Sequence, residues 1–124
     1  MTSHRIERVN ALFREEISQL IFREMRSPDL KGLISVTEVD TTADLRHARV
    51  FISVMAANDA ERDLTFATLK KAEGFFRRAL SERLRMYRIP EIEVVHDESI
   101  ERGARVMSLL KEIEREEEKP DGDQ

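Results

Sequence analysis

Cysteine is absent from this sequence, which excludes a disulfide framework, thiolate metal sites and thiol catalysis. Proline and glycine are scarce, with three and four residues, and the chain combines 40% apolar with 37% charged residues. This composition predicts an ordered, helix-rich globule with a heavily charged surface. No apolar run approaches the roughly 20 residues that a membrane span requires, and the polar N-terminus lacks the apolar segment of a signal peptide. We therefore expect one domain in the reducing cytoplasm, without a membrane partner.

The net charge of −4 is distributed unevenly along the chain. Residues 70–88 carry seven cations and two acids, a local charge of +5. Residues 111–124 carry three cations and seven acids, a local charge of −4. A basic centre and an acidic tail mean that the overall charge does not argue against a nucleic-acid partner.

Hydrophobic periodicity predicts an α+β fold. Asn58, followed three residues later by Glu61, is typical of a capping box that opens a helix, and Ser99 is expected to cap the last helix. The predicted domain covers residues 1–114, and the unpatterned acidic residues 115–124 are expected to form a disordered tail. The expected elements are helices over residues 3–25, 59–72, 75–87 and from 99 onward, and a three-stranded sheet over 33–40, 46–55 and 92–96. The predicted core contains Phe13, Ile17, Val50, Ile52, Phe76, Leu80 and Leu84.

A glycine interrupts the helical pattern at Gly74, in the middle of the basic segment. Glycine within a helix costs roughly 1 kcal/mol relative to alanine, so its presence indicates a bend, a positive φ or a close backbone approach. In the helix expected after the bend, Tyr87 falls on the core face with the apolar residues, Arg83 also projects there and must snorkel or form a pair, and four arginines fall on the opposite face. These features predict a single RNA-binding surface that exposes cations and helix-terminal amides to a phosphate backbone. Its candidate residues are Lys70, Lys71, Ala72, Gly74, Arg77, Arg78, Arg85 and Arg88.

Catalytic and metal-binding patterns are missing from the sequence. The three histidines are far apart and lack the spacing of a metal site. Asp97 and Glu98 form the one carboxylate pair considered for acid/base chemistry, but acidic residues are favoured at a helix N-terminus in any case. We therefore expect no enzyme activity, cofactor or metal. Two other hypotheses stay open: a protein-interaction adaptor whose basic helix meets an acidic partner, and a small hydrolase that uses these two carboxylates.

The predicted order helix, strand, strand, helix, bend, helix, strand is that of a type II KH domain. At the bend this chain has Ala72-Glu73-Gly74 in place of Gly-x-x-Gly, and with this kink residues 5–113 resemble the bacterial ribosome-binding factor A family. One departure is Ser27-Pro28-Asp29, where that family often has Asp-Pro-Arg. The other matching residues are Arg5, Arg8 and Val9; Asp44, Leu45 and Arg46 with Ala48, Val50 and Ser53; Phe76, Arg77 and Leu84; and Pro90, Asp97, Ser99, Gly103, Arg105, Leu109 and Leu110.

This resemblance implies a type II KH-like fold with an added C-terminal helix. It also implies a non-catalytic cytoplasmic factor that binds the immature small ribosomal subunit and its rRNA, assists late maturation and then leaves. Release by a GTPase and a monomeric state are further expectations from the same resemblance.

Overall fold

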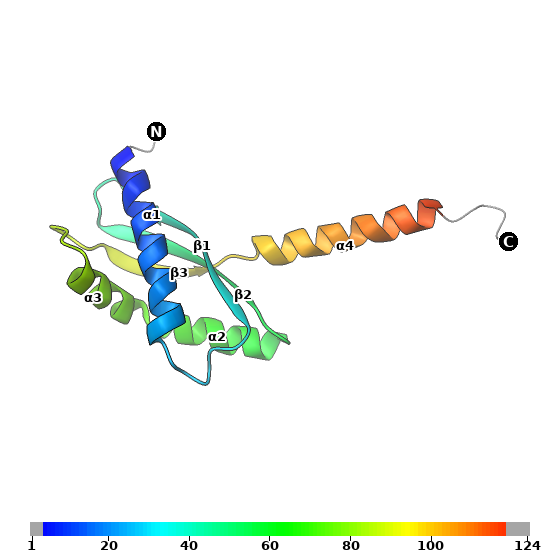
Figure 1. The fold of residues 1–124 in the computed structure, drawn as a ribbon, viewed down its shortest axis with the longest axis horizontal. Coiled ribbons are helices and arrows are strands. Elements are labelled where there is room, and N and C mark those ends of the chain that lie inside the picture. Colours follow the sequence, from blue (N-terminus) through cyan, green and yellow to red (C-terminus); the bar gives the residue numbers. More distant parts are fainter. Residues whose placement is uncertain (1–3, 119–124) are drawn as a thin grey trace.

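The computed structural model describes residues 4–118, which contain four α-helices and a three-stranded sheet (Figure 1). The element order agrees with the predicted order, so the α+β class is confirmed. In chain order the elements are α1 (His4–Gln19), a π-helical turn η1 (Leu20–Glu24), β1 (Leu33–Thr41), β2 (His47–Met55), α2 (Asp59–Lys71), α3 (Glu73–Arg83), β3 (Glu91–His96) and α4 (Ser99–Glu118).

The sheet has the strand order β1-β2-β3. β1 and β2 form the predicted antiparallel hairpin, in which Val36 pairs with Ile52, and a bulge follows Val36. β3 pairs with β2 in parallel, with Val94 opposite Val50. A parallel neighbour requires a crossover connection, and α2 and α3 provide it. The start of β3 therefore lies beside the start of β2, next to the hairpin turn.

One hydrophobic core joins α1, α2 and α3 to one face of the sheet. Ala48, Val50 and Ile52 are buried and alternate with more exposed residues along β2, as expected for a sheet covered on one side. Each large side chain buried there contributes roughly 1.5–3 kcal/mol. Leu84, also predicted for the core, is only partly buried against it. The other six predicted core residues are fully buried in one cluster: Phe13, Ile17, Val50, Ile52, Phe76 and Leu80.

Two local features hold α2 and the loop before β1 in place. The Asn58 side chain accepts a hydrogen bond of 2.8 Å from the Glu61 amide, which confirms the predicted cap. Thr65 of α2 is fully buried, and its hydroxyl accepts a 2.8 Å hydrogen bond from the Lys31 amide. The next residue, Gly32, has a φ of +79°, and a Cβ there would lie 2.1 Å from a backbone oxygen. Only glycine fits this turn.

The helix predicted over residues 75–87 is too long, because α3 ends at Arg83. Leu84 is extended, with a φ of −111° and a ψ of 135°, and the chain continues irregularly to β3. Partly buried Leu84 and Met86 alternate with exposed Arg85 and Tyr87, so this connection is an extended segment and does not continue the helix. Tertiary packing, which must bring the chain back to the start of β3, overrides the helical pattern. Tyr87 is therefore not a core residue.

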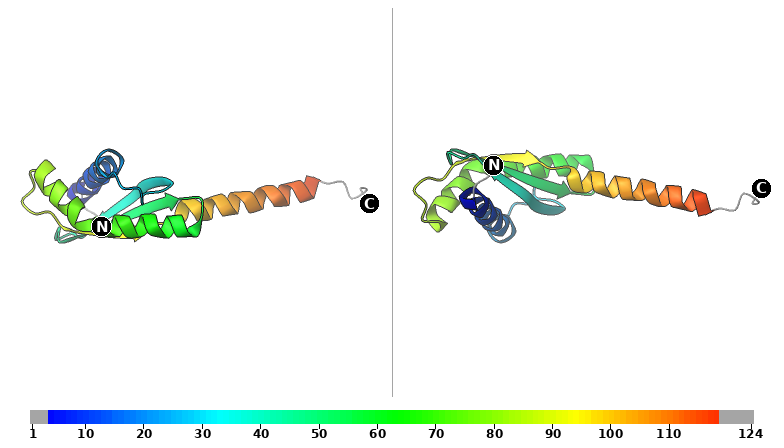
Figure 2. Two further views of the ribbon diagram at one scale, coloured as in Figure 1. Left: turned by 90° about the horizontal axis from the view of Figure 1, so that it is seen from below. Right: turned by 90° about the horizontal axis from the view of Figure 1, so that it is seen from above.

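The C-terminal helix α4 extends away from the rest of the protein in every view (Figures 1 and 2). The tail prediction began at residue 115, but residues 115–118 continue α4, since arginine and glutamate are good helix formers. The remaining predicted tail, residues 119–124, lies outside the described residues. The large apolar side chains of α4 are all exposed: Ile100, Val106, Met107, Leu109, Leu110 and Ile113.

Candidate nucleic-acid interface

The predicted kink is present, but Ala72 and not Gly74 forms it. Ala72 separates α2 from α3 with a φ of −87° and a ψ of 4°. Gly74 is the second residue of α3 and does not have a positive φ, so the expectation of a glycine-specific backbone at this position is wrong. A Cβ built on Gly74 would meet no atom of the described residues within 4 Å beyond its own helical turn. The space in front of the kink is therefore open.

Two side chains tie the kink to the sheet. The Glu73 carboxylate accepts a 2.7 Å hydrogen bond from the Val94 amide on the edge strand β3. The Lys70 ammonium donates 3.2 Å hydrogen bonds to the Val94 carbonyl and to Glu73. These contacts satisfy backbone groups at the sheet edge. Lys70 thus has a structural role, whereas the side chain of the neighbouring Lys71 has no hydrogen bond or ion pair among residues 4–118.

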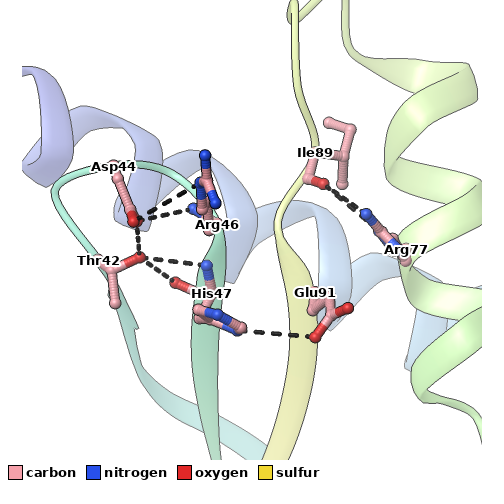
Figure 3. A network of polar contacts seen from close by, with 7 residues as sticks. All are labelled: Thr42, Asp44, Arg46, His47, Arg77, Ile89 and Glu91. Carbon is pink, nitrogen blue, oxygen red and sulfur yellow. Dashed lines mark hydrogen bonds and ion pairs between the residues drawn. The ribbon is translucent and has the colours of Figure 1, made fainter.

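Arg77 and Arg78 differ in what they contact. The Arg77 guanidinium donates to the Ile89 carbonyl from Nε at 3.4 Å and from Nη2 at 3.3 Å (Figure 3). It thereby fixes the connection between α3 and β3. The Arg78 side chain is exposed and has no hydrogen bond or ion pair within the described part of the chain. Arg83, the predicted exception on the apolar side, forms ion pairs with Glu16 and Glu24.

Arg85 and Arg88 lie beyond the end of α3, so the predicted four-arginine helix face does not exist. Both instead line a cleft of about 640 Å³ together with Arg5 and Arg8 of α1 and Arg46 at the end of the hairpin turn. We call this the arginine cleft. One acidic residue, Asp44, lines it, which leaves a net charge of +4. The other lining residues are Val9, Leu12, Leu45, Met86 and Tyr87.

The hairpin turn is shaped by hydrogen bonds to Asp44 (Figure 3). The Asp44 carboxylate accepts from the Thr42 hydroxyl at 2.6 Å and from the Arg46 amide at 3.1 Å. The hydrogen bond from Thr42 is the main reason that the pKa of Asp44 lies below its ordinary value. Leu45 has a φ of +60°, which is unusual for a leucine, and packs against the core. The turn thus packs partly buried Leu45 against the core and places Arg46 at the cleft.

Most of the charge in the arginine cleft is not neutralised by the protein. Within residues 4–118, the side chains of Arg5, Arg8 and Arg85 have no hydrogen bond or ion pair, and the same holds for the side chain of Arg88. Arg46 is loosely paired, with its Nε 3.9 Å from an Asp44 oxygen. Unpaired guanidinium groups in one concave site create a positive potential that attracts anions. Their planar fork matches the oxygens of a phosphate.

The sequence-based candidate residues did not include Arg5, Arg8 and Arg46, which the structure places in the arginine cleft. A signal for them was present, because all three belong to the short matches that carried the family resemblance. Of the eight predicted residues, only Arg85 and Arg88 reach the arginine cleft. Lys70, Lys71, Ala72 and Gly74 lie at the other end of α3, which is about 16 Å long.

Asp97 and Glu98, the two carboxylates of the hydrolase hypothesis, both form contacts that support the fold. Asp97 accepts from the Thr37 hydroxyl at 2.5 Å and from the Ser99 amide at 2.9 Å, and these bonds lower its pKa. Glu98 pairs with Arg102 at 3.1 Å, which lowers the pKa of Glu98. Neither carboxyl is suited to act as a general acid near neutral pH. Residues 4–118 contain no cluster of three potential metal ligands, and none of their helices has the length and apolar character of a membrane span.

Comparisons with known proteins agree on one family. A family model described as ribosome-binding factor A matches residues 5–110. The ribosome-binding factor A of Halothermothrix orenii is 44% identical over 118 residues, which covers 95% of this chain and 95% of the relative.

Solved structures show the same fold. The crystal structure of ribosome-binding factor A from Thermus thermophilus superposes with a TM-score of 0.62 at 22% identity, covering 73% of this chain and 93% of that one. A homology model of the Thermus thermophilus protein, fitted into a cryo-EM map of its complex with 30S, gives a TM-score of 0.55 at 22% identity and covers 79% and 97% of the two chains. The predicted type II KH-like fold class is thereby confirmed.

Proposed function

The chain belongs to the ribosome-binding factor A family, and from this premise we propose that it is a non-enzymatic factor of ribosome biogenesis. In this proposal the protein acts in the cytoplasm, where it binds the immature small ribosomal subunit, contacts its rRNA and assists late maturation and rRNA processing. The reported complex of the Thermus thermophilus protein with 30S supports the choice of partner.

The arginine cleft is the observation that carries this proposal. Five arginines converge there from three separate segments of the chain, and four of them have no partner within the described residues. Gathering unpaired cations in one place is unfavourable in the free protein, because the charges repel one another. An RNA backbone relieves that repulsion, and the release of its counterions favours binding.

The kink provides a second contact in the proposal. Lys71 and Gly74 are exposed there, and the open space at Gly74 leaves room for a sugar–phosphate backbone to approach Ala72. Exposed Arg78 lies between the kink and the cleft on α3. An RNA strand that follows α3 would thus meet Lys71, then Arg78, and then the arginine cleft. We further propose that the protein acts as a monomer and that a GTPase or completion of the subunit triggers its release.

Charge reversal in the cleft tests this function. Arg85→Glu combined with Arg88→Glu should spare folding, since both side chains are exposed and unpaired within residues 4–118. We expect that the variant no longer cosediments with small-subunit particles in a sucrose gradient. The slope of the logarithm of its binding constant for single-stranded RNA against the logarithm of the salt concentration should become shallower by about 1.4, because two cations no longer release counterions.

Arg23→Glu combined with Arg26→Glu is the matched control. It makes the same change of charge at two exposed arginines beyond the opposite end of α1, roughly 25 Å from Arg5 along the helix. The control should sediment as the unmodified protein does. A folded cleft variant that still cosediments with immature small subunits would contradict the proposal. Salt-insensitive binding to an acidic protein, without binding to RNA, would support the adaptor hypothesis instead.

A further inference from the structure

A fully exposed aromatic ring stands at the edge of the arginine cleft. Tyr87 lines the cleft and retains 101% of its reference exposure. Its neighbours Arg85 and Arg88 line the same cleft. The hydrophobic effect favours burial of aromatic side chains, and this ring is not buried, so core packing does not explain a tyrosine at this position.

The backbone on both sides of Tyr87 is held in place. Met86 packs against the core, and Ile89 is buried within it. The Ile89 carbonyl accepts two hydrogen bonds from Arg77, as Figure 3 shows. Anchors before and after a residue reduce the entropy that its segment loses when a ligand binds. The ring is thus presented on a fixed support beside unpaired cations.

We propose that Tyr87 stacks against an unpaired base of the RNA strand whose phosphates occupy the arginine cleft. This inference rests on the proposed RNA-binding function and adds the nature of the ligand. An aromatic ring beside a cationic groove is the general arrangement by which proteins hold single-stranded nucleic acid. The flanking guanidinium groups hold the phosphates, and the ring holds the base.

The ligand is single-stranded for two reasons. In a duplex, each base is already stacked on its neighbours, and proteins recognise A-form RNA mainly by its shape and backbone. A base that stacks on Tyr87 must therefore be unpaired or turned out of its helix. The cleft volume of about 640 Å³ is that of a small-molecule site, which suits one or two nucleotides and not the face of a helix.

Intrinsic fluorescence gives a direct test, because Tyr87 is the only tyrosine and the chain has no tryptophan. The full chain is titrated with a single-stranded RNA of uridines that contains one central adenosine, with a duplex of equal length in parallel. The fluorescence lifetime is recorded, since absorption of the exciting light by RNA does not affect it. We expect the single strand to shorten the lifetime and the duplex to leave it unchanged. An unchanged lifetime at saturating single strand would overturn the stacking.

Affinity measurements on variants separate stacking from phosphate binding. Tyr87→Ala should weaken binding of the single strand by about fivefold to a hundredfold and leave the salt dependence unchanged, because tyrosine carries no charge. Tyr87→Phe, which keeps the ring, should restore most of the affinity. Phe22→Ala is the matched control, because Phe22 is also an exposed aromatic, at 89%, but lies at the other end of the first helical segment. This control should bind as the unmodified protein does.

Replacing the central adenosine by an abasic nucleotide completes the test. The unmodified protein should lose affinity for the abasic strand, whereas Tyr87→Ala should bind both strands equally. If Tyr87→Ala binds the intact strand normally while reversal of Arg85 and Arg88 abolishes binding, stacking is wrong and the phosphate site stands. If neither variant changes RNA binding, the proposed function fails as well. If Tyr87→Ala weakens binding of polyglutamate as much as of RNA, the residue serves an acidic protein partner, and the stacking inference is wrong.

Discussion

Replacing Gly74 with alanine should stabilise the protein and at the same time weaken its binding to RNA. The stability gain follows from the position of Gly74 inside α3, with helical backbone angles and an open space where the new methyl group would lie. The loss of binding follows from the same open space, which we propose an RNA backbone to occupy. The two effects have different causes and are measured separately.

The magnitude can be worked out from helix propensities. Alanine is favoured over glycine by roughly 0.5–1 kcal/mol within a helix, partly because glycine leaves the unfolded chain more freedom. Gly74 lies in the first turn, so we expect the lower limit, a gain of about 0.5 kcal/mol or roughly 2 °C in Tm. Gly74→Val should change stability by less than about 0.5 kcal/mol, since valine has a helix propensity between those of glycine and alanine.

Urea denaturation followed by circular dichroism measures the stability of all three proteins, and fluorescence anisotropy of labelled single-stranded RNA measures their affinity. A loss of more than about 1 kcal/mol in the alanine variant would refute the helical, unobstructed backbone at Gly74, because only strain or a collision costs that much. Unchanged RNA affinity in a stabilised variant would remove the kink from the proposed binding surface.

Two further predictions concern polar contacts of the fold. Asp97 has a lowered pKa, so its hydrogen bonds to Thr37 and Ser99 stabilise the fold above the ordinary pKa of 3.8 and are lost as the pH falls through the lower folded value. The difference in stability between the unmodified protein and Asp97→Asn, measured from urea midpoints, should therefore be constant near pH 7 and shrink below about pH 4. A difference that grows in acid would contradict this assignment. Thr65→Val should lower the free energy of unfolding by roughly 1–3 kcal/mol in the same assay, because valine has nearly the same shape but leaves the Lys31 amide without its acceptor. An unchanged urea midpoint would mean that this hydrogen bond does not support the fold.

The elements with clear periodicity could be predicted from the sequence. The apolar repeat through Phe13 and Ile17 gave the first helix, alternation through Val50 and Ile52 gave a half-buried strand, and Asn58 marked the start of α2. In each case one local pattern agreed with the tertiary environment, which is the condition for a reliable prediction.

The end of α3 could not be placed in the same way. Leu80 and Leu84 suit a helix, whereas Leu84 and Met86 suit an extended segment, so the two patterns overlap at Leu84. The parallel pairing of β3 with β2 decides between them, and no local signal reports it. The prediction therefore placed Arg85 and Arg88 on a helix face, whereas both lie in the connection that follows α3.

The candidate site was incomplete for a related reason. Sequence reasoning grouped cations that are close along the chain, but the arginine cleft collects its cations from three segments that only the fold brings together. Of these, Arg46 depends on the turn that Asp44 and Leu45 build, with a leucine in a left-handed conformation. Such a conformation cannot be anticipated from residue type, since it is rare for leucine.

The assembly of the cleft from residues 5–8, 44–46 and 85–88 has a consequence for newly made protein. Contacts between segments some 80 residues apart have a high contact order, and their loop-closure entropy is overcome only when the intervening chain also folds. A nascent chain that has not yet emerged as far as Arg85 carries three of the five arginines but no cleft. RNA binding at this site therefore begins only when synthesis and folding are nearly complete, so an incomplete translation product does not compete with the finished protein.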